Sequence, residues 1–150
     1  HDCYGETKNM NSSNTNSGGW TSCAMRSTHL PAILALMPTE VQNGIREVHK
    51  MTSAGSQSAT INTTADKLFL LSEIEIFGSV SYSKSGEGTQ YDYYKAGNSK
   101  AKKYNGSVYA WWERSPIASD SARFCLVDSN GSASYNLASY AFGVAFGFCF

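Results

Sequence analysis

The sequence predicts an α+β fold, with short helices early in the chain and strands late. Apolar side chains at Leu30, Ile33, Leu34 and Met37 fall on one helical face. Near the end, residues 144–150 alternate bulky with small side chains, which is the period of a strand. Because the helical and strand signals are separated along the chain and do not alternate, they favour α+β over α/β.

The composition fits one globular domain over residues 1–150. The chain has 150 residues, of which 41% are hydrophobic and 13% aromatic, enough for a sizeable core. Charged residues make up 16% and the formal net charge is +0, so no concentrated basic face is available for nucleic acid. The only basic cluster is expected to be a solvated loop, and it comprises Lys100, Lys102 and Lys103.

Membrane insertion is not expected, because no apolar run approaches the ~18 residues that a spanning helix needs. The chain opens with His1 instead of Met and shows no signal peptide. We therefore expect it to be a fragment of a longer protein.

The first helices are bounded by recognisable signals. Residues 1–19 are polar, and residues 11–19 predict a long loop before Trp20. The helix over residues 30–37 has Ser27 or Thr28 as a candidate cap, carries Pro31 in its first turn and stops at Pro38. A second short helix is expected over residues 39–45, with Val41 and Ile45 facing inward.

The middle of the chain predicts a strand over residues 45–52, a polar loop over 53–64 and a buried extended run over 68–71. Ser72 and Glu75 have capping-box spacing, which predicts a short helix that ends at Gly78. Residues 89–96 predict another brief helical segment, closed by Gly97.

The last third predicts strands over residues 108–114, 124–128 and 144–150. Pro116 halts the first, and Asn130 with Gly131 is the signal of a tight hairpin after the second. The rest of residues 115–142 is expected to form loops.

The cysteines at positions 3, 23, 125 and 149 match no zinc spacing. Cys125 and Cys149 each follow a Phe in a strand-like segment, so they are candidate cross-strand neighbours. The favoured interpretation is two small buried apolar side chains, and a disulfide is the alternative. The three histidines lie in the first third of the chain. No catalytic or metal-binding constellation is therefore expected, and no cofactor.

Residues 115–142 consist almost wholly of Ser, Ala, Asn, Asp, Tyr, Phe and Leu. Tyr offers a large rigid contact area, while Ser and Asn adapt their hydrogen bonds, as in antibody loops. This composition favours a binding surface, and ordinary strand-connecting loops are the alternative.

None of the Lys, Glu, Gln, Trp and Met residues of the chain lies in residues 115–150. These five amino acids are the ones that an AAC or AAT codon cannot encode after replacement of its adenines alone. The absence of Lys and Glu is compatible with β structure, but the absence of Trp and Met is harder to explain in that way. Mutagenesis at adenines would explain both.

Residues 111–116, 124–131 and 143–148 resemble a bacterial and phage domain with the pattern WWxRSP, F-x-V-x-x-x-G and GV-x-x-x-F. Residues 68–73 and 90–96 also match the FLLSE and QYxYYK segments of that domain. That pattern is similar to proteins of C-type-lectin-like fold in the formylglycine-generating-enzyme-like branch. Among them are the variable proteins of diversity-generating retroelements, whose C-terminal region is mutagenised at adenines. The resemblance implies short helices early and a mostly antiparallel sheet with long loops late.

The resemblance implies a fixed scaffold and a variable face over residues 115–142. Trp111 and Trp112 would lie in or beside the core, Arg114 would be paired with carboxylate or backbone groups, and Glu113 would face the other side, beside Arg114 or in solvent. From codon reach and loop placement we expect the variable, ligand-contacting positions to be Ile117, Ala118, Asp120, Ala122, Arg123, Leu126, Asp128, Ser132, Ser134, Tyr135, Leu137 and Tyr140.

The resemblance therefore implies a receptor-binding domain of a phage tail tip or a bacterial surface, directed at a host-surface protein or glycan, with homo-oligomerisation expected by family analogy. The calcium motifs of sugar-binding lectins are absent. The alternatives are a phage decoration domain without its own ligand and an oxidase of the formylglycine-generating type that uses Cys125 and Cys149.

Overall fold

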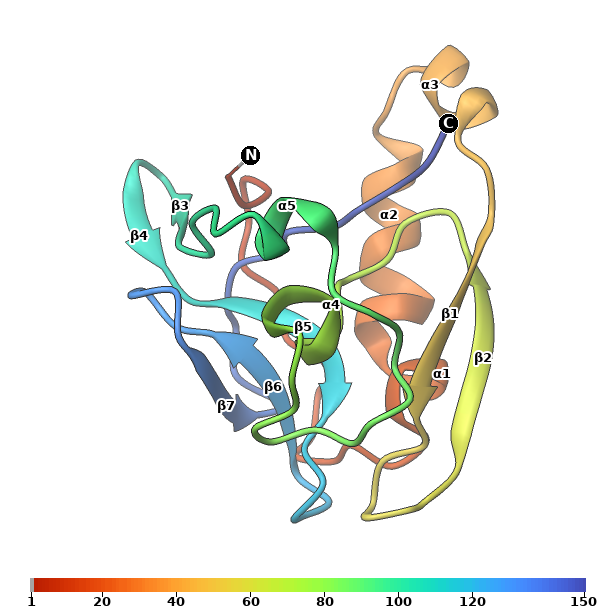
Figure 1. The fold of residues 1–150 in the computed structure, drawn as a ribbon. Coiled ribbons are helices and arrows are strands. Elements are labelled where there is room, and N and C mark those ends of the chain that lie inside the picture. Colours follow the sequence, from red (N-terminus) through yellow and green to blue (C-terminus); the bar gives the residue numbers. More distant parts are fainter. Residues whose placement is uncertain (1) are drawn as a thin grey trace.

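The computed structural model describes residues 2–150 and has an α+β architecture, as predicted (Figure 1). The helical elements, in chain order, are α1 (Gly19–Ser22), the π-helix η1 (Met25–His29), α2 (Leu30–Ala35), α3 (Thr39–Gly44), α4 (Glu73–Phe77) and α5 (Asp92–Lys95). The strands are β1 (Val48–Ser53), β2 (Ile61–Asp66), β3 (Lys102–Tyr104), β4 (Ser107–Tyr109), β5 (Trp111–Pro116), β6 (Arg123–Val127) and β7 (Ala133–Leu137).

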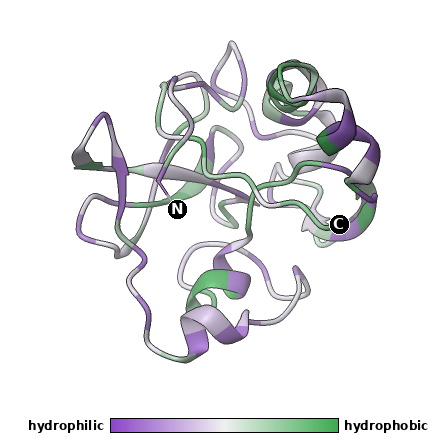
Figure 2. Ribbon diagram, turned by 90° about the horizontal axis from the view of Figure 1, so that it is seen from above, coloured by the Kyte–Doolittle hydropathy of each residue, from purple (hydrophilic) through white to green (hydrophobic). Residues whose placement is uncertain are grey.

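The strands form three separate antiparallel sheets, β1-β2, β3-β4 and β5-β6-β7. In Figure 1 the β1-β2 hairpin lies on the same side of the molecule as α1 and α2, and β6 and β7 lie on the opposite side. The loops at the edge of the molecule are mostly hydrophilic when it is viewed from above (Figure 2).

The helix predicted around Leu30 is present, and Pro31 lies in its first turn. The predicted cap is wrong, because the helical path begins earlier, in η1, and passes directly into α2. The Ser27 hydroxyl accordingly donates to the Cys23 carbonyl, one turn back, and caps no N-terminus. The short helix predicted after Pro38 is confirmed as α3.

The predicted polar loop over residues 53–64 is wrong over residues 61–64, which are part of β2. Strand β2 pairs with β1 in a register that sets Val48 opposite Asp66. Its sequence, Ile-Asn-Thr-Thr-Ala-Asp, has few apolar residues, but its β-branched side chains suit a half-buried hairpin.

The capping box of α4 is confirmed, with reciprocal bonds between Ser72 and Glu75. Gly78 ends the helix at a φ of 75°, a left-handed conformation that favours glycine. The predicted helical segment that Gly97 closes is confirmed as α5.

The C-terminal part departs from the prediction in three places. The chain breaks at Ala110 into β4 and β5, and β7 occupies part of the predicted loop. Residues 144–150 are extended but form no strand. Gly147 bridges Phe69, and Cys149 bridges Arg46. Because these partners come from separate segments, no continuous ladder forms beside the C-terminal end.

Residues of the polar N-terminal segment are built into the core. Met10 and Asn16 are fully buried, and Lys8 bridges Phe142. The loop itself is confirmed, since residues 2–18 form no helix or strand, but a run of Asn and Ser carries no signal for which of its members is buried.

Strand β5 separates two apolar clusters. Trp112 belongs to the larger cluster, together with Trp20, Phe124 and Leu126. Trp111 belongs to the smaller one, with Ile76. Consecutive strand side chains point to opposite faces, and because both faces of β5 are covered, both tryptophans are buried, as predicted.

Candidate ligand-binding surface

The register of β6 and β7 gathers part of the predicted surface on one face of the sheet. Arg123 lies opposite Leu137, and Cys125 lies opposite Tyr135. Since side chains directly opposite each other and two residues apart share a face, Arg123, Tyr135 and Leu137 lie together. Tyr135 is 37% exposed.

An aromatic side chain from another part of the chain joins them. The ring of Tyr82 meets that of Tyr135 edge-on, with centroids 4.8 Å apart and an interplanar angle of 73°. The guanidinium carbon of Arg123 lies 5.4 Å from the Tyr135 centroid, and its Nη1 lies 3.4 Å from Asp120 Oδ2. We call Tyr82, Asp120, Arg123 and Tyr135 the tyrosine surface.

The predicted contact residues differ in exposure. Ser132, Tyr135 and Tyr140 are exposed, and the half-buried ones are Ala118, Asp120, Ala122, Arg123, Asp128, Ser134 and Leu137.

The side chains of Ile117 and Leu126 were predicted to point into solvent, but both are buried, so this prediction is wrong. Leu126 pairs with Trp112 in the sheet and packs in the larger apolar cluster. Ile117 is 2% exposed and its N–H donates to the carbonyl of Arg123. These side chains therefore serve packing.

Asp128 shapes the turn between β6 and β7. Its carboxylate Oδ1 accepts from the N–H groups of Asn130 and Ser132, at 2.8 and 2.9 Å. The turn signal at Asn130 and Gly131 is thus confirmed, but the connection runs over residues 128–132 and is longer than a two-residue turn.

The loop over residues 117–123 is held by its backbone. The buried Asn16 donates from Nδ2 to the carbonyl oxygens of Asp120 and Arg123, at 3.0 and 2.8 Å. Its own N–H donates to the Ser121 carbonyl, and Gln57 Nε2 donates to that of Ser119. The Ala118 N–H donates to the Tyr82 carbonyl. These bonds do not involve the side chains that the loop carries. The one side chain of the loop that also holds it is Asp120, whose Oδ1 accepts from the N–H groups of Ala122 and Arg123 at 2.8 and 3.1 Å.

A strained turn supports the same loop. Ser56 and Gln57 adopt φ values of 47° and 62°, which non-glycine residues rarely show. The Ser56 N–H donates to Asn16 Oδ1 at 2.8 Å. A Cβ on Gly55 would lie 1.7 Å from the Asn16 carbonyl oxygen, so only glycine fits against Asn16. Strain of this kind is concentrated at functional sites.

Tyr82 is positioned by a buried carboxylate. Glu73, at the start of α4, is fully buried. Its oxygens accept from the N–H groups of Ser81, Tyr82 and Ser83 and from the Ser83 hydroxyl, at 2.6 to 3.1 Å. Such bonds to the charged form offset the removal of the carboxylate from water.

Arg114 is buried and paired, as predicted. Its Nη1 donates to Glu75 Oε2 at 2.5 Å and to the Leu70 carbonyl at 3.0 Å, and its Nη2 donates to the Glu87 carbonyl at 2.8 Å. Its Nε donates to Thr52 Oγ1 at 2.9 Å. Arg114 therefore ties β1, α4 and the segment around Glu87 to β5.

Glu113 differs from the prediction, since it is buried and neither carboxylate oxygen has a hydrogen-bond partner among the described residues. Burial, together with the negative charges of Glu73 and Glu87, raises its pKa well above 4.5. Burial likewise raises the pKa of Glu87 to about 7, although the hydrogen bond from the Ser115 hydroxyl lowers it. Burial therefore favours the protonated form of Glu113.

The candidate cross-strand pairing of Cys125 with Cys149 is wrong, and the favoured interpretation of two small buried side chains holds for Cys125 but not for Cys149. Cys125 is buried opposite Tyr135, whereas Cys149 is exposed and bridges Arg46. All four cysteines are free. Burial raises the pKa of Cys125 well above its usual value, so the thiol is protonated.

Within residues 2–150, no cluster of His, Cys, Asp and Glu could hold a metal ion. In the same part of the chain, no helix is long and apolar enough to cross a membrane.

Sequence reasoning missed Asn16, Glu73 and Tyr82 as parts of this region. The spacing of Ser72 and Glu75 did predict that Glu73 lies in the first turn of a helix, which is α4. Nothing in the sequence around Asn16 or Tyr82 indicates that they meet residues more than fifty positions away.

The family described as "Domain of unknown function (DUF6273)" matches residues 2–149 of the chain. No curated protein and no solved structure matches it.

Proposed function

We propose that the chain, which belongs to the DUF6273 family, is a ligand-binding domain of C-type-lectin-like fold. It would recognise its ligand through the tyrosine surface and the adjoining loop over residues 117–123, and it would not be an enzyme. The proposal depends chiefly on one observation: this loop is fixed by hydrogen bonds to its main chain.

Main-chain anchoring is what a surface of changing sequence requires. Asn16 and Gln57 lie outside residues 115–142 and hold carbonyl oxygens that every amino acid possesses. A substitution at Ala118, Ser119 or Ser121 would therefore leave the anchoring bonds in place. The absence of Lys, Glu, Gln, Trp and Met after residue 114 supports the same proposal, because adenine mutagenesis would produce it.

The chemistry of the tyrosine surface suits recognition of a polar macromolecule. Tyr82 and Tyr135 are 38% and 37% exposed, so each presents part of its ring and can present a hydroxyl. Arg123 adds a half-exposed guanidinium. Rigid aromatic rings beside a planar cation are the residue types that dominate binding energy at interfaces.

A host-surface protein or glycan is the proposed class of ligand, and a phage tail tip or a bacterial surface is the proposed location. Several copies in one homo-oligomer would raise the avidity by about 10²–10⁴ over a single site. Modest affinity at each surface would then suffice.

A decoration domain without a ligand is the second candidate. The edge-on pair of Tyr82 and Tyr135 disfavours it, because an inert surface has no need to hold two partly exposed aromatic rings in place. The oxidase alternative would require an activated cysteine pair, and the raised pKa of the buried Cys125 thiol disfavours that.

The encoding locus provides a first test. We expect a neighbouring reverse-transcriptase gene and a template repeat that differs from the coding repeat at adenines. The coding repeat should cover residues 117–140. A locus without a template repeat would contradict variation by this route.

Binding provides the second test. The chain would be applied to an array of bacterial surface glycans and to intact bacterial cells, alongside a variant with Tyr82→Ser, Arg123→Ser and Tyr135→Ser. We expect binding to be lost in this variant and kept in Leu36→Ser, which alters an exposed apolar residue on the α2 side. Equal binding by the triple variant would place recognition elsewhere.

A further inference from the structure

Strand β7 is an edge strand, because the sheet order is β5-β6-β7 and β6 pairs with only one of its sides (Figure 1). Main-chain bonds at the two ends of the β6-β7 pair show which residues face β6. The Asp128 N–H donates to the Ser132 carbonyl, and the Ala138 N–H donates to the Ala122 carbonyl. Opposed residues in an antiparallel ladder alternate between bonded and non-bonded pairs. The main-chain groups of every second residue of β7 therefore point away from β6.

These outward-facing residues are Ala133, Tyr135 and Leu137. Leu137 is satisfied locally, because its N–H donates to Asn136 Oδ1 at 2.8 Å and its carbonyl accepts from the Tyr140 N–H at 3.1 Å. The main-chain groups of Ala133 and Tyr135 have no such partner within residues 2–150. We call the N–H and carbonyl groups of these two residues the open edge.

The open edge lacks the features that usually keep a sheet from pairing with another chain. Edge strands are commonly protected by a charged residue, a proline or a bulge. Strand β7 has the sequence Ala-Ser-Tyr-Asn-Leu, and its register with β6 is continuous. None of the three protections is therefore present in β7.

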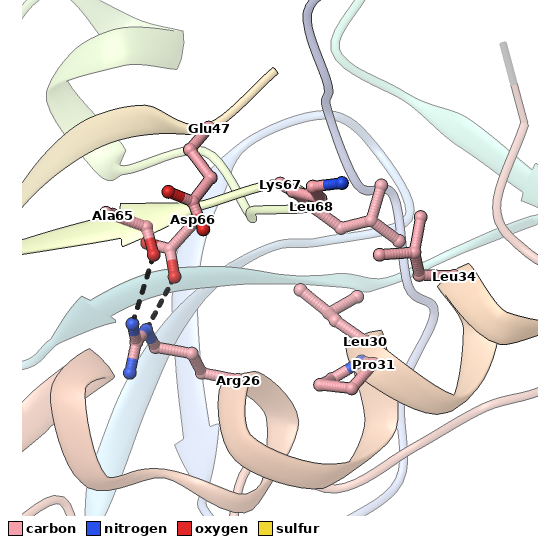
Figure 3. Close-up of a pocket in the computed structure, with 9 residues that line it drawn as sticks. All are labelled: Arg26, Leu30, Pro31, Leu34, Glu47, Ala65, Asp66, Lys67 and Leu68. Atoms are coloured by element: carbon pink, nitrogen blue, oxygen red, sulfur yellow. Dashed lines mark hydrogen bonds and ion pairs between the residues drawn. The ribbon is translucent and has the colours of Figure 1, made fainter. Parts of the chain in front are cut away.

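Strand β2 also has an outer edge, but a side chain closes part of it. Arg26 of η1 donates from Nη2 to the Ala65 carbonyl at 3.3 Å and from Nε to Asp66 Oδ1 at 2.6 Å (Figure 3). In Figure 1, β2 lies on the other side of the molecule from β6 and β7. Only the open edge of β7 includes a member of the tyrosine surface, Tyr135.

We propose that the open edge binds an extended peptide segment of a partner protein, which joins the sheet as a further strand beside β7. An extended polypeptide repeats its N–H and carbonyl groups with the same period as Ala133 and Tyr135, whereas a glycan offers no such repeat. The inference rests on the proposed function, since it takes the ligand of the tyrosine surface to be a protein.

The neighbouring side chains would select among peptides. Alternate side chains of an added strand lie on the same face as the Tyr135 ring, which is 37% exposed. An aromatic or β-branched side chain opposite Tyr135 packs against that ring. The partner segment should therefore carry such residues at alternate positions and no proline where its N–H faces the open edge.

Amide hydrogen exchange, followed by NMR, tests the pairing directly. In the free chain the amides of Ala133 and Tyr135 should exchange rapidly, whereas those of Ser134 and Asn136, which face β6, should be protected. The probe is the capped peptide Lys-Thr-Val-Tyr-Val-Thr-Lys, for which we expect a Kd on the order of 1 mM. At about ten times that concentration, exchange of the Ala133 and Tyr135 amides should slow about tenfold. The control peptide Lys-Thr-Pro-Tyr-Pro-Thr-Lys keeps the tyrosine and the charges and should not slow either amide.

Two proline variants separate strand addition from contact with side chains alone. Ala133→Pro removes one outward N–H and should weaken peptide binding about tenfold, measured at the Tyr135 amide. Thr63→Pro makes the same change at an exposed, outward-facing position of β2 and should leave binding unchanged.

The proposal is overturned if the peptide leaves both amides in rapid exchange, if the proline-containing peptide slows them equally, or if Ala133→Pro binds the peptide as the original chain does. Protection of both amides in the free chain that disappears on dilution would assign the open edge to a second copy of this chain, and would also overturn it. Failure of the proposed function gives a different result. The triple variant of the tyrosine surface would then bind arrays and cells like the original chain, whatever the peptide does to the two amides.

Discussion

Asn16 donates a hydrogen bond of 2.8 Å from its side-chain amide to the carbonyl oxygen of Arg123, a residue 107 positions further along the chain. This bond joins the N-terminal segment to the first residue of β6. The same amide holds Asp120, and its oxygen holds Ser56. One buried amide thus fixes two loops that meet beside the tyrosine surface.

Asn16→Ala should lower the free energy of unfolding by about 2–4 kcal/mol. The substitution removes the partner of the Asp120 carbonyl and of the Ser56 N–H, and it leaves the Arg123 carbonyl with the Ile117 N–H alone. Lost hydrogen bonds of partly buried groups lower stability. Urea unfolding followed by tryptophan fluorescence measures the change. Asn43→Ala, at an exposed position in α3, is the matched control and should change stability by less than about 0.5 kcal/mol.

Substitutions on the loop over residues 117–123 should change the stability of the protein by different amounts, depending on whether the replaced side chain is buried. Ser119→Tyr and Ser121→Tyr should each change stability by no more than about 0.5 kcal/mol, because both side chains are exposed and the anchoring bonds involve the main chain. Ile117→Ala should lower stability by about 2–5 kcal/mol, because Ile117 is buried. Thermal unfolding of the variants distinguishes the two groups, and equal losses would contradict main-chain anchoring.

How much the sequence could predict depended on how local each signal is. The capping box at Ser72 and Glu75 and the turn at Asn130 and Gly131 involve residues a few positions apart, and both predictions were confirmed. Strand β7 was missed because its Ser, Tyr and Asn carry little apolar periodicity, and its pairing with β6 decides its conformation.

The candidate site was predictable in outline only. Arg123, Tyr135 and Leu137 could be assigned to the last third of the chain, but Tyr82 reaches them through the turn held by Glu73. The burial of Leu126 follows from its position opposite Trp112, a register that a single sequence does not reveal. Glu113 was wrongly expected outside the core because strand alternation predicts solvent on one face, and here both faces of β5 are covered.

Arg114→Met should lower stability by about 3–5 kcal/mol, because it leaves the buried Glu75 carboxylate without its nearest cation. Burial would raise the pKa of Glu75, but the hydrogen bond and charge of Arg114, together with Lys50, lower it. The double variant Arg114→Met with Glu75→Gln should recover part of the loss, since it removes the charge left unpaired. Chemical unfolding of the two single variants and the double variant forms the cycle. Strict additivity would contradict the direct pairing.

Stability should depend on pH through Glu113. Its folded-state pKa is raised well above 4.5, so its favourable contribution is fully present below about pH 4.5 and is lost as the pH rises toward the folded value. Glu87, whose pKa is raised to about 7, acts in the same direction between pH 4.5 and 7. Glu113→Gln cannot ionise. Its stability relative to the original chain should therefore improve between pH 5 and 8, by at most about 1.4 kcal/mol per pH unit.

Urea unfolding at pH 5, 6, 7 and 8 provides that comparison, with Glu87→Gln as the second variant. Glu6→Gln is the matched control. Its carboxylate is exposed and pairs with Lys8, which lowers the pKa of Glu6, so the control should show no gain in relative stability above pH 5. If the stability difference between Glu113→Gln and the original chain stays constant from pH 5 to 8, Glu113 does not take up its proton on folding. Its two oxygens would then need a partner that the folded chain between residues 2 and 150 does not provide.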